Sequence, residues 1–163
     1  MGNLPKPRFH AMKLLSKLGT QEIPIHATGD GAGSLVEAWA SRDTDGRIAI
    51  LLWNLTLDQT KAAGEPALTR RIALTLPDLD GTWILRQTPL NAGSGNIAAT
   101  VNALGIRDWP RDNAQWAELA EAAKLHTTET TVSAHGSLSV ELTLDMPSAV
   151  LVELSQDVDI AAG

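Results

Sequence analysis

Apolar and polar residues alternate along most of the chain, and this two-residue period is typical of β-strands that have one buried face. In Leu138–Leu144, for example, every second residue is leucine or valine. The segment Asp43–Gly46 separates two apolar runs and ends in Asp-Gly, which predicts a hairpin turn between antiparallel strands. The expected strands are Leu35–Ser41, Arg47–Asn54, Thr69–Leu76, Thr82–Thr88, Glu129–Ala134, Leu138–Leu144 and Ala149–Leu154.

Further turn signals lie between these strands. Pro77–Gly81 is rich in turn residues and predicts that Thr82–Thr88 returns after Thr69–Leu76, and His135-Gly136 predicts a second such turn. Short strands joined by turns favour an antiparallel sandwich over a fold in which strands and helices alternate. The predicted fold class is therefore mainly β: an antiparallel β-sandwich with an N-terminal helix and one or two short inserted helices.

The segment Pro7–Leu18 follows helical spacing instead, with Phe9, Met12, Leu15 and Leu18 at three-residue intervals. A proline at its start and a glycine after its end suit the termini of a helix. An apolar stripe on a short terminal helix must be buried against something. We therefore interpret these four side chains as a contact with another domain.

Two shorter helices are expected between the strands. Ile97–Leu104 ends before a glycine, and Asn113–Leu125 follows Asp112, a residue that suits the N-cap position. Trp109 lies in the loop between them and is a candidate for a contact surface.

We expect three segments along the chain: residues 1–19 as a linker and terminal helix, 20–157 as the β-sandwich, and 158–163 as a flexible tail. Gly29–Gly33 has the composition of a phosphate-binding loop, but a strand rather than a helix is expected after it. We interpret this loop as a flexible connection.

Composition and charge exclude several classes of function. The 163 residues include 13 Lys and Arg against 19 Asp and Glu, a net charge of −6 without a basic patch, so no nucleic-acid partner is expected. No apolar run is long enough to span a bilayer, so we expect a soluble protein without a membrane partner. The compartment is left open between bacterial cytoplasm and periplasm. Cysteine is absent and the four histidines are scattered, so neither a metal nor a cofactor is expected.

Hydrolysis of a glycosidic bond needs two carboxyl groups close together, one of them with a raised pKa. No acid in the sequence has the apolar flank that would raise the pKa of a proton donor. We interpret the candidates as solvated acids and assign no catalytic residue. The pairs considered are Glu118 with Glu121, Asp78 with Asp80, and Glu37 with Glu141.

Trp39 and Trp53 lie on neighbouring expected strands, and two interpretations stay open for them. Both rings can belong to the sandwich core, as the alternation of Trp53 with Leu51 indicates. Exposed and coplanar, they would instead form a platform for stacking a sugar ring. Trp39 and Trp109 are therefore the candidates for contact with a sugar or another surface.

Several stretches, taken in order, carry a family resemblance. Lys6–Gly19 reads KPRFHAMKLLSKLG, and Arg47–Leu55 reads RIAILLWNL. Asn96–Pro110 and Leu119–Leu125 follow, and a strand pair within Leu138–Leu154 closes the chain. In this order and spacing they resemble glycoside hydrolase family 39, the β-xylosidase and α-L-iduronidase group, over nearly the whole chain. The sequence departs from that pattern at Val101, Arg107 and Pro89–Gly93.

The resemblance implies the C-terminal β-sandwich of such a retaining glycosidase, preceded by the last helix of its catalytic barrel. The catalytic glutamates of the family belong to the barrel, so on this resemblance the chain alone is not an enzyme. Its expected partner is the barrel of the parent glycosidase, which it would stabilise, and self-association through the N-terminal helix is expected for a fragment. Two other hypotheses are a free-standing carbohydrate-binding module that uses exposed Trp residues, and an independent enzyme.

Overall fold

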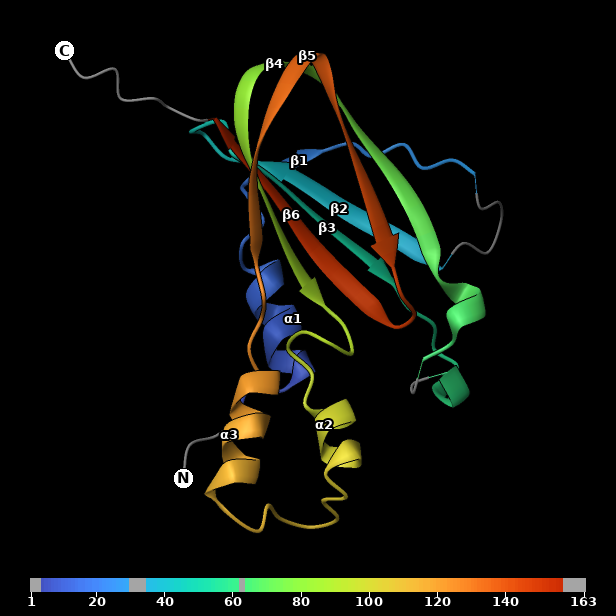
Figure 1. The fold of residues 1–163 in the computed structure, drawn as a ribbon. Helices are drawn as coiled ribbons and strands as arrows, with labels where there is room; N and C mark the ends of the chain where they lie inside the picture. Colours follow the sequence, from blue (N-terminus) through green and yellow to red (C-terminus); the bar gives the residue numbers. More distant parts are fainter. Residues whose placement is uncertain (1–3, 30–34, 62–63, 157–163) are drawn as a thin grey trace, which may run out of the picture.

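The computed structural model describes residues 4–29, 35–61 and 64–156, and in these ranges six strands form one antiparallel sheet in the order β1-β2-β3-β6-β4-β5 (Figure 1). The predictions for most of the Gly-rich loop and for the tail 158–163 lie outside the described residues. The strands are β1 (Gln21–Ile23), β2 (Val36–Arg42), β3 (Ile48–Asn54), β4 (Arg70–Leu90), β5 (Thr128–Leu144) and β6 (Ser148–Gln156). The α-helices are α1 (Pro7–Leu15), α2 (Ala98–Ala103) and α3 (Asn113–Ala122), and short 3-10 turns cover Gln59–Lys61 and Pro66–Leu68.

The sandwich is made from this one sheet because β4 and β5 are long and bend together. They pair along nearly their full length, and Figure 1 shows both strands curving over at the top of the molecule. The first half of β4 and the last half of β5 therefore form a layer that faces β2, β3 and β6. Leu76 and Val140 from this layer and Ile50 and Val152 from the other belong to the same buried core. The predicted antiparallel β-sandwich is confirmed.

The predicted turns at Pro77–Gly81 and His135-Gly136 are wrong as chain reversals. Each strand continues through its turn signal, and the register shifts by one residue between Pro77 and Leu79. Asp78 takes up the extra residue with a φ of 57°, while Gly136 on the facing strand has a φ of 75°. A β-bulge of this kind bends and twists both strands without ending their pairing. The two halves of each strand consequently lie in different layers.

Other local predictions are confirmed. β2 and β3 form the expected hairpin, in which Gly46 has a φ of 87° and its N–H donates to the carbonyl oxygen of Asp43 at 3.0 Å. α3 follows Asp112, whose carboxylate accepts a hydrogen bond from the N–H of Gln115 at 2.9 Å. This side chain satisfies one of the free donors at the helix start, as an N-cap does. None of the helices in the described ranges is long and apolar enough to cross a membrane.

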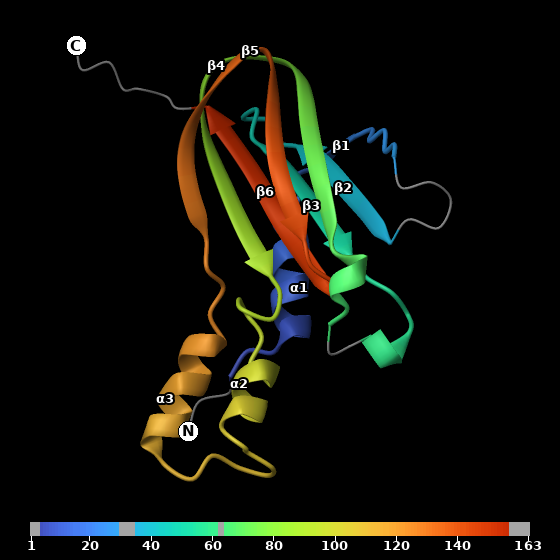
Figure 2. The same cartoon turned by 45° about the vertical axis from the view of Figure 1, so that its right-hand side comes forward.

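A second, smaller core lies on the outer face of the sheet, where α1 packs. Leu14 is 1% exposed and contacts a cluster that includes Leu51 of β3, Leu90 of β4 and Leu151 of β6. Figure 2 shows α1 lying against the lower ends of these strands. α1 ends at Leu15, earlier than predicted.

The helices α2 and α3 project from the end of the sheet as an arm, which Figures 1 and 2 show below β4. Backbone hydrogen bonding closes its base, where the N–H of Gly95 donates to the carbonyl oxygen of Lys124 at 2.8 Å. Gly95 has a φ of 71°, and a Cβ on it would lie 2.7 Å from a methyl carbon of Leu125. Any other residue here would have a strained backbone and would have to displace neighbouring side chains, so glycine suits this crossing.

Candidate functional site

The four residues predicted as a domain contact do not share one apolar face, and Leu18 lies after the end of α1. Leu15 and Leu18 are partly buried and pack against the second core. Phe9 and Met12 point away from it, with 61% and 62% of their surface exposed. Residues three apart on a helix are rotated by roughly 60° from one another, so a stripe with this spacing drifts around the helix. α1 consequently has one apolar side on its own sheet and a second apolar side that is open.

A network of charges fixes the end of α1 to the sandwich. The carboxylate of Glu153 on β6 accepts from Lys17 Nζ at 2.9 Å and from Arg47 Nη1 at 3.0 Å. Arg47 also donates from Nε to Asp43 at 2.9 Å and from Nη2 to the carbonyl oxygen of Lys17 at 2.8 Å. Glu153 is only 9% exposed, so water screens these contacts weakly. The direction of α1 relative to the sheet is therefore held by ionic as well as apolar contacts.

Sequence reasoning missed this network. Asp43 and Arg47 lie at the two ends of the predicted hairpin turn, so their pairing across it was open to prediction. The Glu153 contacts join positions more than 100 residues apart, and no local pattern indicates them.

The segment after α1 passes tightly against the same hairpin. The N–H of Gly19 donates to Ser41 Oγ at 2.7 Å. A Cβ at Gly19 would lie 2.6 Å from a carboxylate oxygen of Asp43 and 2.8 Å from the carbonyl carbon of Arg42. This glycine is required for close approach of the chain.

His10 connects the buried side of α1 to the arm. Its side chain is 5% exposed, and its Nε2–H donates to the carbonyl oxygen of Ala123, at the end of α3, at 2.7 Å. The other ring nitrogen, Nδ1, is buried without a hydrogen-bond partner in the part of the chain that the structure describes. α1 is thus the element that touches both the sandwich and the arm.

Four of the five tryptophans form two pairs. Trp39 and Trp53 lie 5.2 Å apart with their planes at 79°, and Trp109 and Trp116 lie 5.2 Å apart at 74°. Trp39 is 55% exposed and Trp109 is 62% exposed, whereas Trp53 packs against the second core. The edge-to-face geometry means that Trp39 and Trp53 do not form a coplanar platform.

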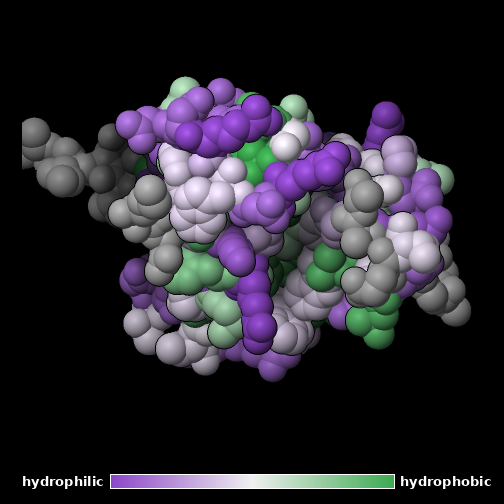
Figure 3. Space-filling view, turned by 90° about the horizontal axis from the view of Figure 1, so that it is seen from below, coloured by the Kyte–Doolittle hydropathy of each residue, from purple (hydrophilic) through white to green (hydrophobic). Residues whose placement is uncertain are grey.

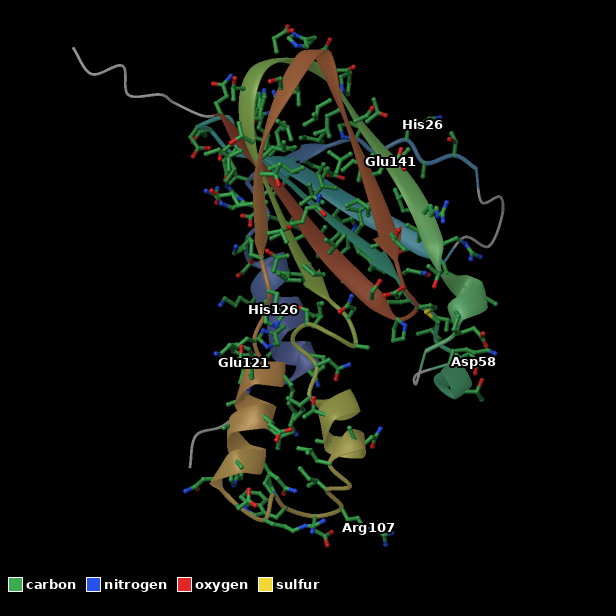
Figure 4. The ribbon with its side chains drawn as sticks, in the orientation of Figure 1. His26, Asp58, Arg107, Glu121, His126 and Glu141 are labelled. Carbon is green, nitrogen blue, oxygen red and sulfur yellow. The ribbon has the colours of Figure 1, made fainter. Side chains whose placement is uncertain are left out.

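Members of different candidate pairs lie far apart. Glu121 on α3 and Glu141 on β5 lie in distant parts of the molecule (Figure 4). A hydrogen bond from Lys124, together with its charge, lowers the pKa of Glu121, which is the opposite of what a proton donor needs. Two surface depressions of about 270 and 330 Å³ contain one carboxylate each, Glu141 and Glu22 respectively. Neither contains the pair that glycoside hydrolysis requires.

No group of three metal-ligating side chains occurs in the described ranges. From below, small apolar areas alternate with hydrophilic side chains, with no single broad apolar face (Figure 3). The exposed apolar features described above are the open side of α1, Trp39 and Trp109.

Comparison with known proteins finds similarity to glycosidases. No family model matches it. A β-xylosidase from Geobacillus stearothermophilus is 27% identical over 155 residues, which make up 94% of this chain and 28% of that enzyme.

Solved structures show the same relation. The GH39 enzyme from Xanthomonas axonopodis pv. citri has a TM-score of 0.73 at 16% identity, over 94% of this chain and 31% of that one. A monomeric β-xylosidase from Caulobacter crescentus CB15 also has a TM-score of 0.73, at 19% identity, over 95% of this chain and 31% of that one. The chain thus spans less than a third of the length of these enzymes. In sequence and in fold, it resembles a segment of glycoside hydrolase family 39 enzymes.

Proposed function

We propose that the chain is the non-catalytic C-terminal accessory domain of a retaining glycosidase of the β-xylosidase type, acting in carbohydrate metabolism. Its role is to pack on the catalytic barrel and stabilise it. Residues 1–19 supply the last helix of the barrel, and residues 20–157 form the β-sandwich.

One observation carries the proposal: the chain matches 28% of a β-xylosidase over 94% of its own length. A complete relative of that enzyme would match it over most of both chains. A segment that leaves more than two thirds of the enzyme unmatched corresponds instead to one part of it. The mainly β content of the segment differs from the alternating strands and helices of a barrel that hydrolyses sugars.

The two apolar sides of α1 support docking of the barrel on this helix. A helix that joins two domains needs an apolar side toward each of them. Leu14 provides the side toward the sandwich, and Phe9 and Met12 provide large apolar surfaces on the other side. Large side chains exposed next to each other in this way are typical of an interaction site.

The rigidity of the α1 attachment supports a structural role. The Lys17, Arg47 and Glu153 contacts and the Gly19 crossing hold the end of the helix in one direction. His10 holds the arm to its start. A fixed helix can transmit the orientation of one domain to the other, and its contacts lower the entropy that docking would otherwise cost.

Hydrolysis by the chain alone tests the non-catalytic part of the proposal. The repurified chain is assayed with nitrophenyl β-xyloside and nitrophenyl α-L-iduronide, beside a complete family 39 β-xylosidase as the positive control. We expect no turnover by the chain. Turnover that survives repurification and falls in Glu141→Gln or Glu121→Gln would contradict the proposal, because a carboxylate of this chain would then be catalytic.

A further inference from the structure

The outer face of β2 has a shallow depression of about 330 Å³ next to the end of α1, and its role does not follow from docking on a barrel. Trp39 of β2 and Glu22 of the short strand β1 both line it. The residues around it include Leu18, Gly19, Thr20, Glu22, Trp39 and Ser41.

The Trp39 ring is held ready for a ligand. Trp53 supports it edge-to-face, with the ring centres 5.2 Å apart and the planes at 79°. In such a pair Trp53 covers at most one face of the Trp39 indole, and 55% of Trp39 is exposed. Trp53 is itself packed on the second core, so the support does not depend on a mobile side chain. Little ordering of the ring is needed on binding.

Two carboxylates lie on the same sheet face as this ring. Glu22 is opposite Ser41 in the β1–β2 pairing, so both side chains lie on the same sheet face as Trp39. Glu37 precedes Trp39 by two residues and shares that face. Neither carboxylate has an ion-pair partner among the described residues. The nearby cation Lys17 is engaged by Glu153.

We infer that this depression is a binding subsite for one neutral pyranose ring of a glycan. The C–H face of the sugar stacks on Trp39, and the Glu22 carboxylate accepts a hydrogen bond from a ring hydroxyl. Sugar hydroxyls donate hydrogen bonds to carboxylates, whereas a uronate in the same place would face Glu22 and Glu37 with like charge. The subsite therefore selects neutral sugars over acidic ones. This inference stands independently of the proposed accessory role.

Indole resonances give a direct test, because the chain has five Trp residues and the Nε1–H of each gives its own NMR signal. The 163-residue chain is titrated with xylohexaose as the neutral probe and with hexagalacturonate as the anionic probe of equal length. We expect xylohexaose to shift the Trp39 signal with a Kd in the range of about 1 mM, and hexagalacturonate to bind at least about tenfold more weakly.

Matched variants separate the subsite from general surface stacking. Trp39→Ala is expected to lower the xylohexaose affinity at least about tenfold. Trp109→Ala removes a ring of similar exposure in the arm and should leave the affinity unchanged. Glu22→Gln should reduce the discrimination against hexagalacturonate. Trp39→Phe keeps an aromatic face and should retain part of the binding if Trp39→Ala does not fold.

The inference would be overturned if xylohexaose shifts no indole signal up to about 10 mM. It would also be overturned if Trp109→Ala weakens xylohexaose binding as much as Trp39→Ala does, or if xylohexaose and hexagalacturonate bind equally. Absence of binding here leaves the accessory role untouched, since that role depends on α1 and not on Trp39.

Discussion

Truncation of Leu14 to alanine should destabilise the chain far more than truncation of Phe9, although phenylalanine is the larger side chain. Leu14 is 1% exposed and contacts Leu51 and Leu151 beneath α1. Removing a buried leucine side chain of this kind costs about 3 kcal/mol through lost burial and the cavity left behind. Phe9 is 61% exposed, so Phe9→Ala should change the free energy of unfolding by less than about 0.5 kcal/mol.

Both losses of unfolding free energy are measured by urea unfolding, monitored through tryptophan fluorescence. An unchanged m-value shows that the variants unfold in the same way as the wild-type chain. For a chain of this size, 3 kcal/mol lowers Tm by roughly 6–12 °C. Alanine favours helix in both variants, so helix propensity does not produce the difference. A loss below about 1 kcal/mol for Leu14→Ala, or a comparable loss for Phe9→Ala, would refute the assignment of the two sides of α1.

Three further predictions concern the rest of the chain. Gly95→Ala should lower the free energy of unfolding by about 2–3 kcal/mol, because a positive φ and a steric clash act together. Gly105→Ala, where φ is also positive but the space is open, should lower it by about 1 kcal/mol. Equal Tm losses for the two variants would contradict this. Arg47→Ala should lower the free energy of unfolding in urea by about 2 kcal/mol, because it leaves the nearly buried Glu153 carboxylate with one cation. An unchanged urea midpoint would disprove the role of the charge network around Glu153. A hydrogen bond from Lys61 lowers the pKa of Glu65. The Glu65–Lys61 contact therefore stabilises the fold above the ordinary pKa of glutamate, and this stabilisation is lost as pH falls through the lowered pKa. The Tm difference between the wild-type chain and Glu65→Gln should consequently vanish in acid and not grow.

Local patterns predicted the parts of the fold that depend on neighbouring residues. The β2–β3 hairpin followed from Asp-Gly between two apolar runs, and the start of α3 followed from the cap at Asp112. Each of these features is determined within a few residues. The layered arrangement also followed, because alternation indicates strands with one buried face.

The bend of β4 and β5 was not predictable in the same way. Pro77–Gly81 has turn composition whether the chain reverses or bulges, and the outcome depends on the strand that pairs with it. Gly136 lies opposite Leu79 in the folded chain, 57 positions away in sequence, and lets the two strands bend together. That partnership is a long-range property, so local composition predicted a reversal instead of a bulge.

The candidate site was partly predictable. The sequence indicated that α1 has apolar residues for a contact, and the structure separates Leu15 and Leu18 from the exposed Phe9 and Met12. The spacing alone did not reveal which side the sheet would cover. The buried role of His10 depends on the end of α3, and no pattern near it indicated that partner.

Assembly with a catalytic barrel tests the central claim most directly. This chain is co-expressed with the barrel of a family 39 β-xylosidase that lacks its own β-rich segment. Size-exclusion chromatography measures complex formation, and nitrophenyl β-xyloside hydrolysis measures activity. We expect a complex with more activity than the barrel alone. Phe9→Ala combined with Met12→Ala should weaken this complex at least about tenfold. Leu57→Ala, which removes a side chain that is 95% exposed elsewhere, should have no effect. Absence of a complex, or equal weakening by the Leu57 variant, would contradict docking of the barrel on α1.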